Sequence, residues 1–226
     1  RDAQESRGLG DVYKRQLIYP VLGILFTSLF MMAVNPIMGV INTAISGALN
    51  GLSGTSIVLL GIICAGMQAT DMGGPINKAA YVFGTAALAE QTLQGNMIMA
   101  AVMAGGMVPP LVIALSTTFF KNRWTEADRK AGLVNYIMGL SFITEGAIPF
   151  AAADPLRVLP ACILGSATAG GLSMLFGCAS PAPHGGAWVI AVITNPVQYL
   201  LALAIGAVVG CLVLSFLKKP LDKATE

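Results

Sequence analysis

Charged residues are scarce in this chain. Asp, Glu, Lys and Arg make up 11% of its 226 residues, whereas a typical soluble domain has about 25%. The formal net charge is only +2, which gives no electrostatic basis for binding nucleic acid. Apolar residues make up 55% of the chain, and the mean hydropathy is +0.74. This composition predicts an all-α integral membrane protein.

Histidine and paired cysteines are also rare. His184 is the only histidine, and the four cysteines form no CxxC motif. Cysteines in apolar surroundings usually behave as small buried hydrophobic residues. The sequence therefore supports neither a metal site nor a redox function, and no cofactor is expected.

The sequence divides into three unequal parts. Residues 1–16 hold seven of the 24 charged residues (13 basic plus 11 acidic) and lack the apolar region of a signal peptide. We interpret them as a disordered or non-native leader. Residues 17–219 are expected to form a membrane-embedded domain, and residues 220–226 a cytoplasmic tail.

Long uncharged runs predict membrane helices, because about 20 apolar residues are needed to cross a bilayer. The first run, Leu17–Val34, is expected to end at Asn35-Pro36, since the residue before proline is disfavoured in a helix. Ile37–Asn50 would then be a separate short segment. The other predicted apolar segments are Ser56–Thr70, Asn96–Phe120, Leu156–Phe176 and Ala187–Leu217, the last interrupted at Asn195-Pro196.

Three segments rich in glycine and proline interrupt these runs: residues 71–81, 141–157 and 177–186. The stretch before the second break, Gly132–Ile143, is too short to cross a bilayer. We expect residues 132–154 to form a re-entrant hairpin with Glu145 near its tip. The basic loop 121–130 and Lys218-Lys219 then lie on the same, cytoplasmic side, as the positive-inside rule favours. The predicted fold is a multi-span helical bundle with re-entrant or broken helices.

Ionisable residues gather at these breaks. A carboxylate in hydrocarbon costs roughly 2.5–3.5 kcal/mol, so one that persists there usually faces a polar cavity. Broken helices also expose backbone groups that bind solutes in transporters. We therefore expect the groups to converge on one polar chamber. Outside the leader, the 121–130 loop, Lys218-Lys219 and the tail, the charged residues are Asp71, Lys78, Glu90, Glu145, Asp154 and Arg157.

Each of these residues has more than one interpretation. Glu145 as a carboxylate only accepts hydrogen bonds and suits a hydroxyl-rich ligand, although burial or a pair with Arg157 would be structural alternatives. Asp154 and Arg157, three residues apart, favour an ion pair at a helix start. Asp71 and Lys78 fit either a structural pair or contact with ligand.

Two further polar residues lie in the breaks, whereas Glu90 is interpreted as structural. Asn77 offers both donors and acceptors to a polar ligand. His184 lies in a rigid PAPHGG turn, where it is either solvated or a neutral imidazole that accepts a hydroxyl proton.

Three motifs together resemble one family. DMGGPINKAAY, SFITEGAIPFAAADPLRVLP and SPAPHGG, in that order, are similar to the fructose-specific IIC permease of the bacterial phosphoenolpyruvate-dependent sugar phosphotransferase system. The resemblance covers about residues 17–219 and implies a chain that lacks the N-terminal spans of the family. It implies that the chain binds sugar from the outside and presents it inward, where a IIB partner phosphorylates it. The implied sugar-binding residues are Asp71, Gly73, Gly74, Asn77, Lys78, Thr144, Glu145 and His184.

The resemblance also implies partners and a location. These are a fructose-like sugar, phosphorylated IIA and IIB domains, membrane lipid and the bacterial cytoplasmic membrane. A homodimer is implied as well, which the GxxxG pair of Gly206 and Gly210 would suit. The chain itself would carry no phosphoryl-transferring residue. Transferase activity would arise only with IIA and IIB, and His184 would assist at the reacting hydroxyl.

Two other classes of protein are alternatives for this sequence. An ion-coupled secondary transporter would use the same broken helices, with Glu145 or Asp71 carrying the proton. An intramembrane hydrolase would use His184 with Ser180, but the sequence has neither a nucleophile elbow nor a metal-ligand pair such as HExxH.

Overall fold

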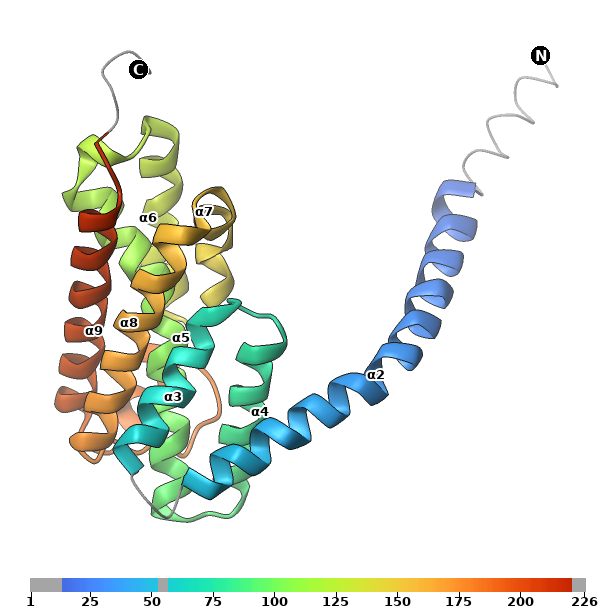
Figure 1. The fold of residues 1–226 in the computed structure, drawn as a ribbon, viewed down its shortest axis with the longest axis horizontal. Helices are drawn as coiled ribbons and strands as arrows, with labels where there is room; N and C mark the ends of the chain where they lie inside the picture. Colours follow the sequence, from blue (N-terminus) through green and yellow to red (C-terminus); the bar gives the residue numbers. More distant parts are fainter. Residues whose placement is uncertain (1–13, 53–56, 221–226) are drawn as a thin grey trace. The chain divides into compact units, whose positions relative to one another are not determined.

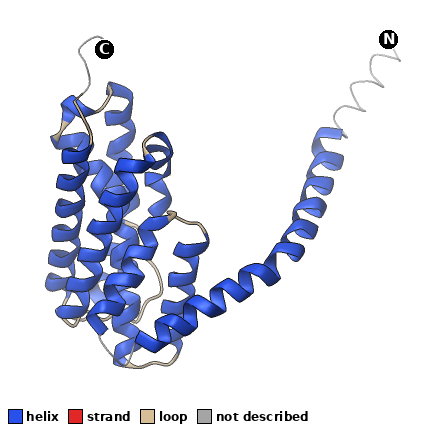
Figure 2. Ribbon diagram, in the orientation of Figure 1, coloured by secondary structure: helices blue, strands red, loops and turns tan. Residues whose placement is uncertain are grey.

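A computed structural model describes residues 14–52 and 57–220 of the chain. These residues form helices and connecting loops, with no β-strand among them (Figure 2). Four of the helices are long and apolar enough to span a membrane, which confirms the all-α prediction. Most of the predicted leader (residues 1–13) and of the tail (residues 221–226) lies outside the described residues.

The N-terminal helix is longer than expected. A short π-helical turn, Lys14–Ile18, leads into α2 (Tyr19–Leu52). The prediction that the helix ends at Asn35-Pro36 is wrong, because Pro36 lies inside α2 and Ile37–Asn50 continues the same helix. Proline costs a helix one hydrogen bond and a local clash, which long apolar helices tolerate. The chain divides after Ile45 into two compact units, and all that follows concerns the second.

The second unit is built around one buried helix, α5 (Leu93–Phe119), whose most apolar window is 94% buried. Small residues let its neighbours approach closely: a Cβ at Gly105 would lie 2.5 Å from the Ala65 Cα. Figure 1 shows the helices packed side by side around α5. The helices that pack against it include α3 (Ile57–Thr70), α4 (Pro75–Ala89), α6 (Glu126–Leu140), α8 (Pro155–Leu175) and α9 (Pro196–Leu217).

The GxxxG pair of α9 packs within the chain. A Cβ at Gly206 would lie 2.6 Å from the Gly165 carbonyl oxygen, and one at Gly210 would lie 3.0 Å from the Ala161 carbonyl oxygen. Both acceptors belong to α8. These glycines therefore join α8 to α9 rather than offering a free face to a second copy.

Residues 126–154 leave and re-enter the same end of the unit. Thr125 and Asp128 form a capping box at the start of α6. The return limb consists of a 3-10 turn (η3, Thr144–Ala147) and α7 (Ile148–Ala153). Just beyond it, Asp154 lies 3.5 Å from Lys218 Nζ, and the Arg123 guanidinium donates to the Lys218 carbonyl. The two basic segments thus meet at one end, as the re-entrant interpretation requires.

The third break reaches inward from the opposite end. Ser180 N–H donates to the Asn96 carbonyl (2.9 Å) near the start of α5. Further along, within the 3-10 segment η4 (Gly186–Val192), Trp188 Nε1 donates to Ser141 Oγ (2.9 Å). The last apolar run is therefore divided, and its membrane helix, α9, begins only at Pro196. The loop connects one end of the unit to the tip of the re-entrant hairpin.

Candidate binding site at the helix breaks

The first break is a turn held by Asp71. Its carboxylate accepts from Ile76 N–H (2.7 Å) and from Asn77 N–H (2.9 Å), the first backbone donors of α4. These donors have no partner within the helix, so Asp71 caps α4. Of the two alternatives for Asp71 and Lys78, a mutual ion pair is therefore not what the structure forms.

A second pair of bonds ties α3 to α4 beneath this turn. Asn77 Nδ2 donates to the Gln68 carbonyl (2.7 Å), and Gln68 Nε2 donates to the Asn77 carbonyl (3.2 Å). Both side chains are almost fully buried. The reciprocal arrangement fixes the start of α4, and with it Lys78.

The second break presents Glu145 from the tip of the re-entrant hairpin. Thr144 is buried, and its hydroxyl donates to the Gly106 carbonyl (2.8 Å) in the middle of α5. Phe142 takes a left-handed conformation (φ +59°), which redirects the chain after α6. The tip is thus attached to the central helix, and Glu145 projects beside the attachment point.

The two breaks meet at Glu145. Its Oε1 lies 3.7 Å from Lys78 Nζ, and the two side chains are 48% and 58% exposed. Gly73 makes this approach possible, since a Cβ there would lie 2.9 Å from Glu145 Oε1 and its φ is +118°. Gly74 packs on Asp71 in the same way, with its Cβ position 2.5 Å from Oδ2. The alternative pair of Glu145 with Arg157 is not formed.

His184 arrives from the third break. Its ring packs on Phe142, with centroids 4.8 Å apart, and edge-on to Tyr81 at 6.4 Å. Its Nδ1 accepts from Gly185 N–H (2.8 Å). In a neutral imidazole with Nδ1 accepting, Nε2 carries the proton and is a donor. This geometry favours donation to a ligand over the expected acceptance of a hydroxyl proton.

These side chains surround a chamber of about 170 Å³. Of the eight residues predicted for the site, five line it, whereas Asp71, Gly73 and Gly74 shape the adjoining turn. Asp154 and Arg157 pair with each other (2.9 Å) at the end that carries Lys218, away from the chamber. The chamber is lined by Gln68, Asn77, Lys78, Tyr81, Phe142, Thr144, Glu145 and His184.

Three of the lining residues, Gln68, Tyr81 and Phe142, are not among the residues predicted from the sequence. Gln68 is a polar residue within the apolar run of α3, three positions before Asp71, and that contrast was a usable signal. Tyr81 is the last residue of the first motif and Phe142 is the second residue of the second motif. Aromatic residues are common in membrane helices, so neither stood out. Their place in the chamber depends on the packing of three breaks against one another.

The fold and the chamber define a class: a helical membrane protein whose polar site lies where interrupted helices meet, as in solute transporters. The chain belongs to the phosphotransferase system EIIC family, since the model of that family matches residues 16–165. It is therefore a multi-pass membrane protein. No solved structure matches it significantly.

Several characterised proteins are similar over most of the chain. The fructose-specific EIIABC component of Bacillus subtilis is 50% identical over 94% of this chain. The fructose permease IIC component of Bacillus amyloliquefaciens is 49% identical over 94%, and the fructose-specific EIIB'BC component of Escherichia coli is 43% identical over 93%. This chain spans 33%, 69% and 38% of the lengths of these three relatives, respectively.

Proposed function

We propose that the chain is the sugar-translocating IIC part of a phosphotransferase system. It binds fructose or a similar hexose in the chamber and presents it for phosphorylation by a IIB partner during uptake. The observation that carries this proposal is the convergence of Glu145, Lys78 and His184, from three separate breaks, on one chamber. Family membership and the names of the fructose-specific relatives support the choice of substrate.

The lining offers complementary groups to a sugar. The Glu145 carboxylate accepts from hydroxyls, whereas the Lys78 ammonium and the His184 Nε2–H donate to them. A hydroxyl that bridges Glu145 and Lys78 would use both its donor and its acceptor capacity. Tyr81 and Phe142 provide apolar faces for the C–H side of the ring. The chain thus binds and orients the sugar, and the phosphoryl group comes from the partner.

The basic end of the unit and its exposed apolar side chains suggest where the IIB partner and the lipid would lie. The end with the 121–130 loop and Lys218 would face the cytoplasm of a bacterium by the positive-inside rule. A IIB domain that has received its phosphoryl group from IIA would approach the chain at this end. One similar protein carries B and C in a single name, EIIB'BC. Lipid would cover exposed side chains such as Leu156 (86%) and Phe216 (85%). A homodimer remains an expectation, and it would use a surface other than Gly206 and Gly210.

Replacement of Glu145 by glutamine tests this proposal. Membrane vesicles with the full-length protein and energised IIA and IIB should convert external fructose into internal fructose phosphate. Hydrogen bonds to a charged group contribute about 1.5–3 kcal/mol, so Glu145→Gln should weaken fructose binding by about 10- to 100-fold. The variant should still insert, because Glu145 is half exposed and makes no buried contact that the substitution removes.

A matched control is Glu90→Gln, because Glu90 is an exposed carboxylate at the end of α4 and does not line the chamber. It should leave binding unchanged. Unaltered fructose binding in Glu145→Gln would remove Glu145 from the site. Uptake of unmodified sugar without IIB, driven by an ion gradient, would favour the secondary-transporter class.

A further inference from the structure

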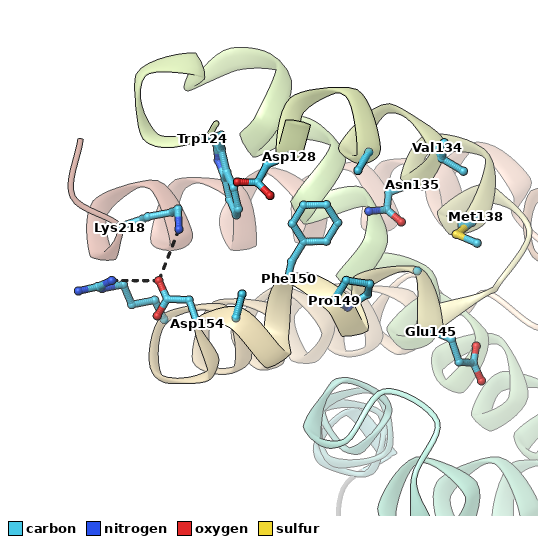
Figure 3. Close-up of a pocket in the computed structure, with 14 residues that line it drawn as sticks. Trp124, Asp128, Val134, Asn135, Met138, Glu145, Pro149, Phe150, Asp154 and Lys218 are labelled. Carbon is cyan, nitrogen blue, oxygen red and sulfur yellow. Dashed lines mark hydrogen bonds and ion pairs between the residues drawn. The ribbon is translucent and has the colours of Figure 1, made fainter. Parts of the chain in front are cut away.

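A second, larger cavity lies between the two limbs of the re-entrant hairpin. We call it the hairpin cavity; it measures about 610 Å³. Figure 3 shows Glu145 at one end and Trp124, Asp154 and Lys218 at the other. Its lining residues used below are Val134, Asn135, Glu145, Asp154, Arg157 and Lys218.

The two cavities differ in size. Sites for small molecules usually measure about 300–1,000 Å³. The hairpin cavity falls within this range, whereas the chamber, at about 170 Å³, is below it. In this conformation the hairpin cavity is therefore the roomier of the two spaces, and its volume suits a whole solute of monosaccharide size.

Asn135 gives the hairpin cavity a specific polar group. Its side chain is 98% buried (2% exposed), and its Nδ2 has no hydrogen-bond partner among the described residues. Its Oδ1 lies against Gly146, where a Cβ would be 2.4 Å from it, and Gly146 also lines the hairpin cavity. In Figure 3 the amide nitrogen points toward Phe150 and the interior of the cavity. A buried donor without a partner is costly, so a solute acceptor that reached Nδ2 would relieve this cost.

Glu145 joins the two spaces. It lines both the chamber and the hairpin cavity, so a solute that it holds in one can be passed to the other. At the far end of the hairpin cavity, Arg157 (2.9 Å) and Lys218 (3.5 Å) pair with Asp154. Asp128 also lines the cavity there, beside Trp124, so two basic groups face two carboxylates. The hairpin cavity thus leads from the chamber toward the basic end.

We propose that the hairpin cavity is a second binding site for a hydroxyl-rich solute of monosaccharide size, in which Asn135 donates a hydrogen bond to the solute. The inference rests on the proposed function and extends it, because it places the sugar or its phosphate ester at a station beyond Glu145. The free sugar and its phosphate ester both carry the hydroxyls that Asn135 and Glu145 would bind. Arg157 and Lys218 at the far end would additionally supply cations for the phosphate of the ester.

Two neighbouring positions on α6 allow a direct test. Val134 lines the hairpin cavity and Leu133 does not, yet the two are 55% and 56% exposed. Val134→Cys and Leu133→Cys, each in the full-length protein, are treated with N-ethylmaleimide in membrane vesicles without a phosphoryl donor. The four native cysteines are buried. At about ten times its Kd, fructose or fructose 1-phosphate should slow alkylation at position 134 by about tenfold and leave position 133 unchanged.

Asn135→Leu, added to Val134→Cys, tests the donor. It removes the unpartnered amide, so the protein without solute should be no less heat-stable. About tenfold more solute should be needed to give the same protection at position 134. Asn135→Asp, which keeps the shape but replaces the donor, should lose protection as well. Retained protection in both variants would overturn the role of Asn135.

The outcomes of these experiments distinguish failure of the second-site proposal from failure of the proposed function. Protection by fructose alone, by fructose 1-phosphate alone or by both supports the second site and identifies its occupant. Equal alkylation at both positions, in a protein that still phosphorylates fructose, overturns the second site while the proposed function stands. Failure of the wild-type protein to phosphorylate fructose with energised IIA and IIB overturns the proposed function itself.

Discussion

The turn of residues 71–74 and the tip of the re-entrant hairpin each carry one carboxylate, and the two carboxylates are used differently. Asp71 accepts two backbone N–H bonds, at 2.7 and 2.9 Å. Glu145 is 48% exposed and has an ammonium group 3.7 Å away. The first carboxylate is committed to the fold, and the second retains acceptor capacity for a solute.

The comparison shows that a carboxylate in an apolar chain does not by itself mark a ligand contact. Its cost in a membrane is offset either by the protein's own donors or by a polar cavity. For Asp71 the donors belong to the first turn of α4, where they lack helical partners. For Glu145 the chamber and the hairpin cavity provide the polar surroundings. Three substitutions test this difference, beginning with the largest expected effect.

Gly73→Ala should disturb both breaks at once. Its φ of +118° is unfavourable for alanine, and the new Cβ would lie 2.9 Å from Glu145 Oε1. A strained backbone position costs about 1–3 kcal/mol, and Glu145 must also move away from Lys78. We expect a lower temperature of thermal unfolding in detergent and loss of fructose binding in vesicles.

Gly66→Ala is the matched control, because a Cβ there meets its nearest neighbours at 3.8 and 3.9 Å. Alanine is favoured over glycine within a helix by about 1 kcal/mol. This variant should therefore be as stable as the wild type or more stable, and should bind fructose normally. A Gly73→Ala protein that behaves like this control would contradict the close approach of the two breaks.

Asp71→Ala should mainly lower stability. It leaves the Ile76 and Asn77 N–H groups without their acceptor, and loss of a helix cap costs about 0.5–2 kcal/mol. Asp71→Asn keeps one acceptor oxygen and should lie between the wild type and Asp71→Ala in thermal unfolding. Fructose affinity, measured below the unfolding temperature, should change much less than in Glu145→Gln. An equal loss of affinity would show that Asp71 contacts the sugar directly.

Local sequence patterns predicted which segments break and which carboxylate lies at the hairpin tip. Glycine and proline clusters end helices for reasons contained in a few neighbouring residues, and the short run before Glu145 required a return to the same side. The end expected at Asn35-Pro36 was wrong because proline restricts a helix without always ending it, and a long apolar segment retains its other backbone bonds.

Which side chains of the site pair with each other could not be predicted from the sequence. Asp71 and Lys78 both flank one break, but whether they pair depends on the direction of the first turn of α4. The pair of Lys78 with Glu145 joins residues 67 positions apart (145 minus 78), and His184 comes from a third segment. The hairpin cavity was not foreseen either, because Asn135 lies in an apolar run and its lack of a partner is a property of three-dimensional packing.

The smallest effect on stability is expected for Lys78→Met. The Lys78–Glu145 pair is long (3.7 Å) and both side chains are about half exposed. Such pairs contribute about 0–1 kcal/mol, so thermal unfolding should shift little. Fructose affinity should nevertheless fall, because methionine cannot donate to a hydroxyl held by Glu145. Lys130→Met is the control: its pair with Glu126 on α6 is exposed, at 76% and 77%, and lies outside the chamber. If Lys78→Met lowered stability as much as Asp71→Ala and left fructose affinity intact, the Lys78–Glu145 pair would be structural, and the functional difference between the two carboxylates would disappear.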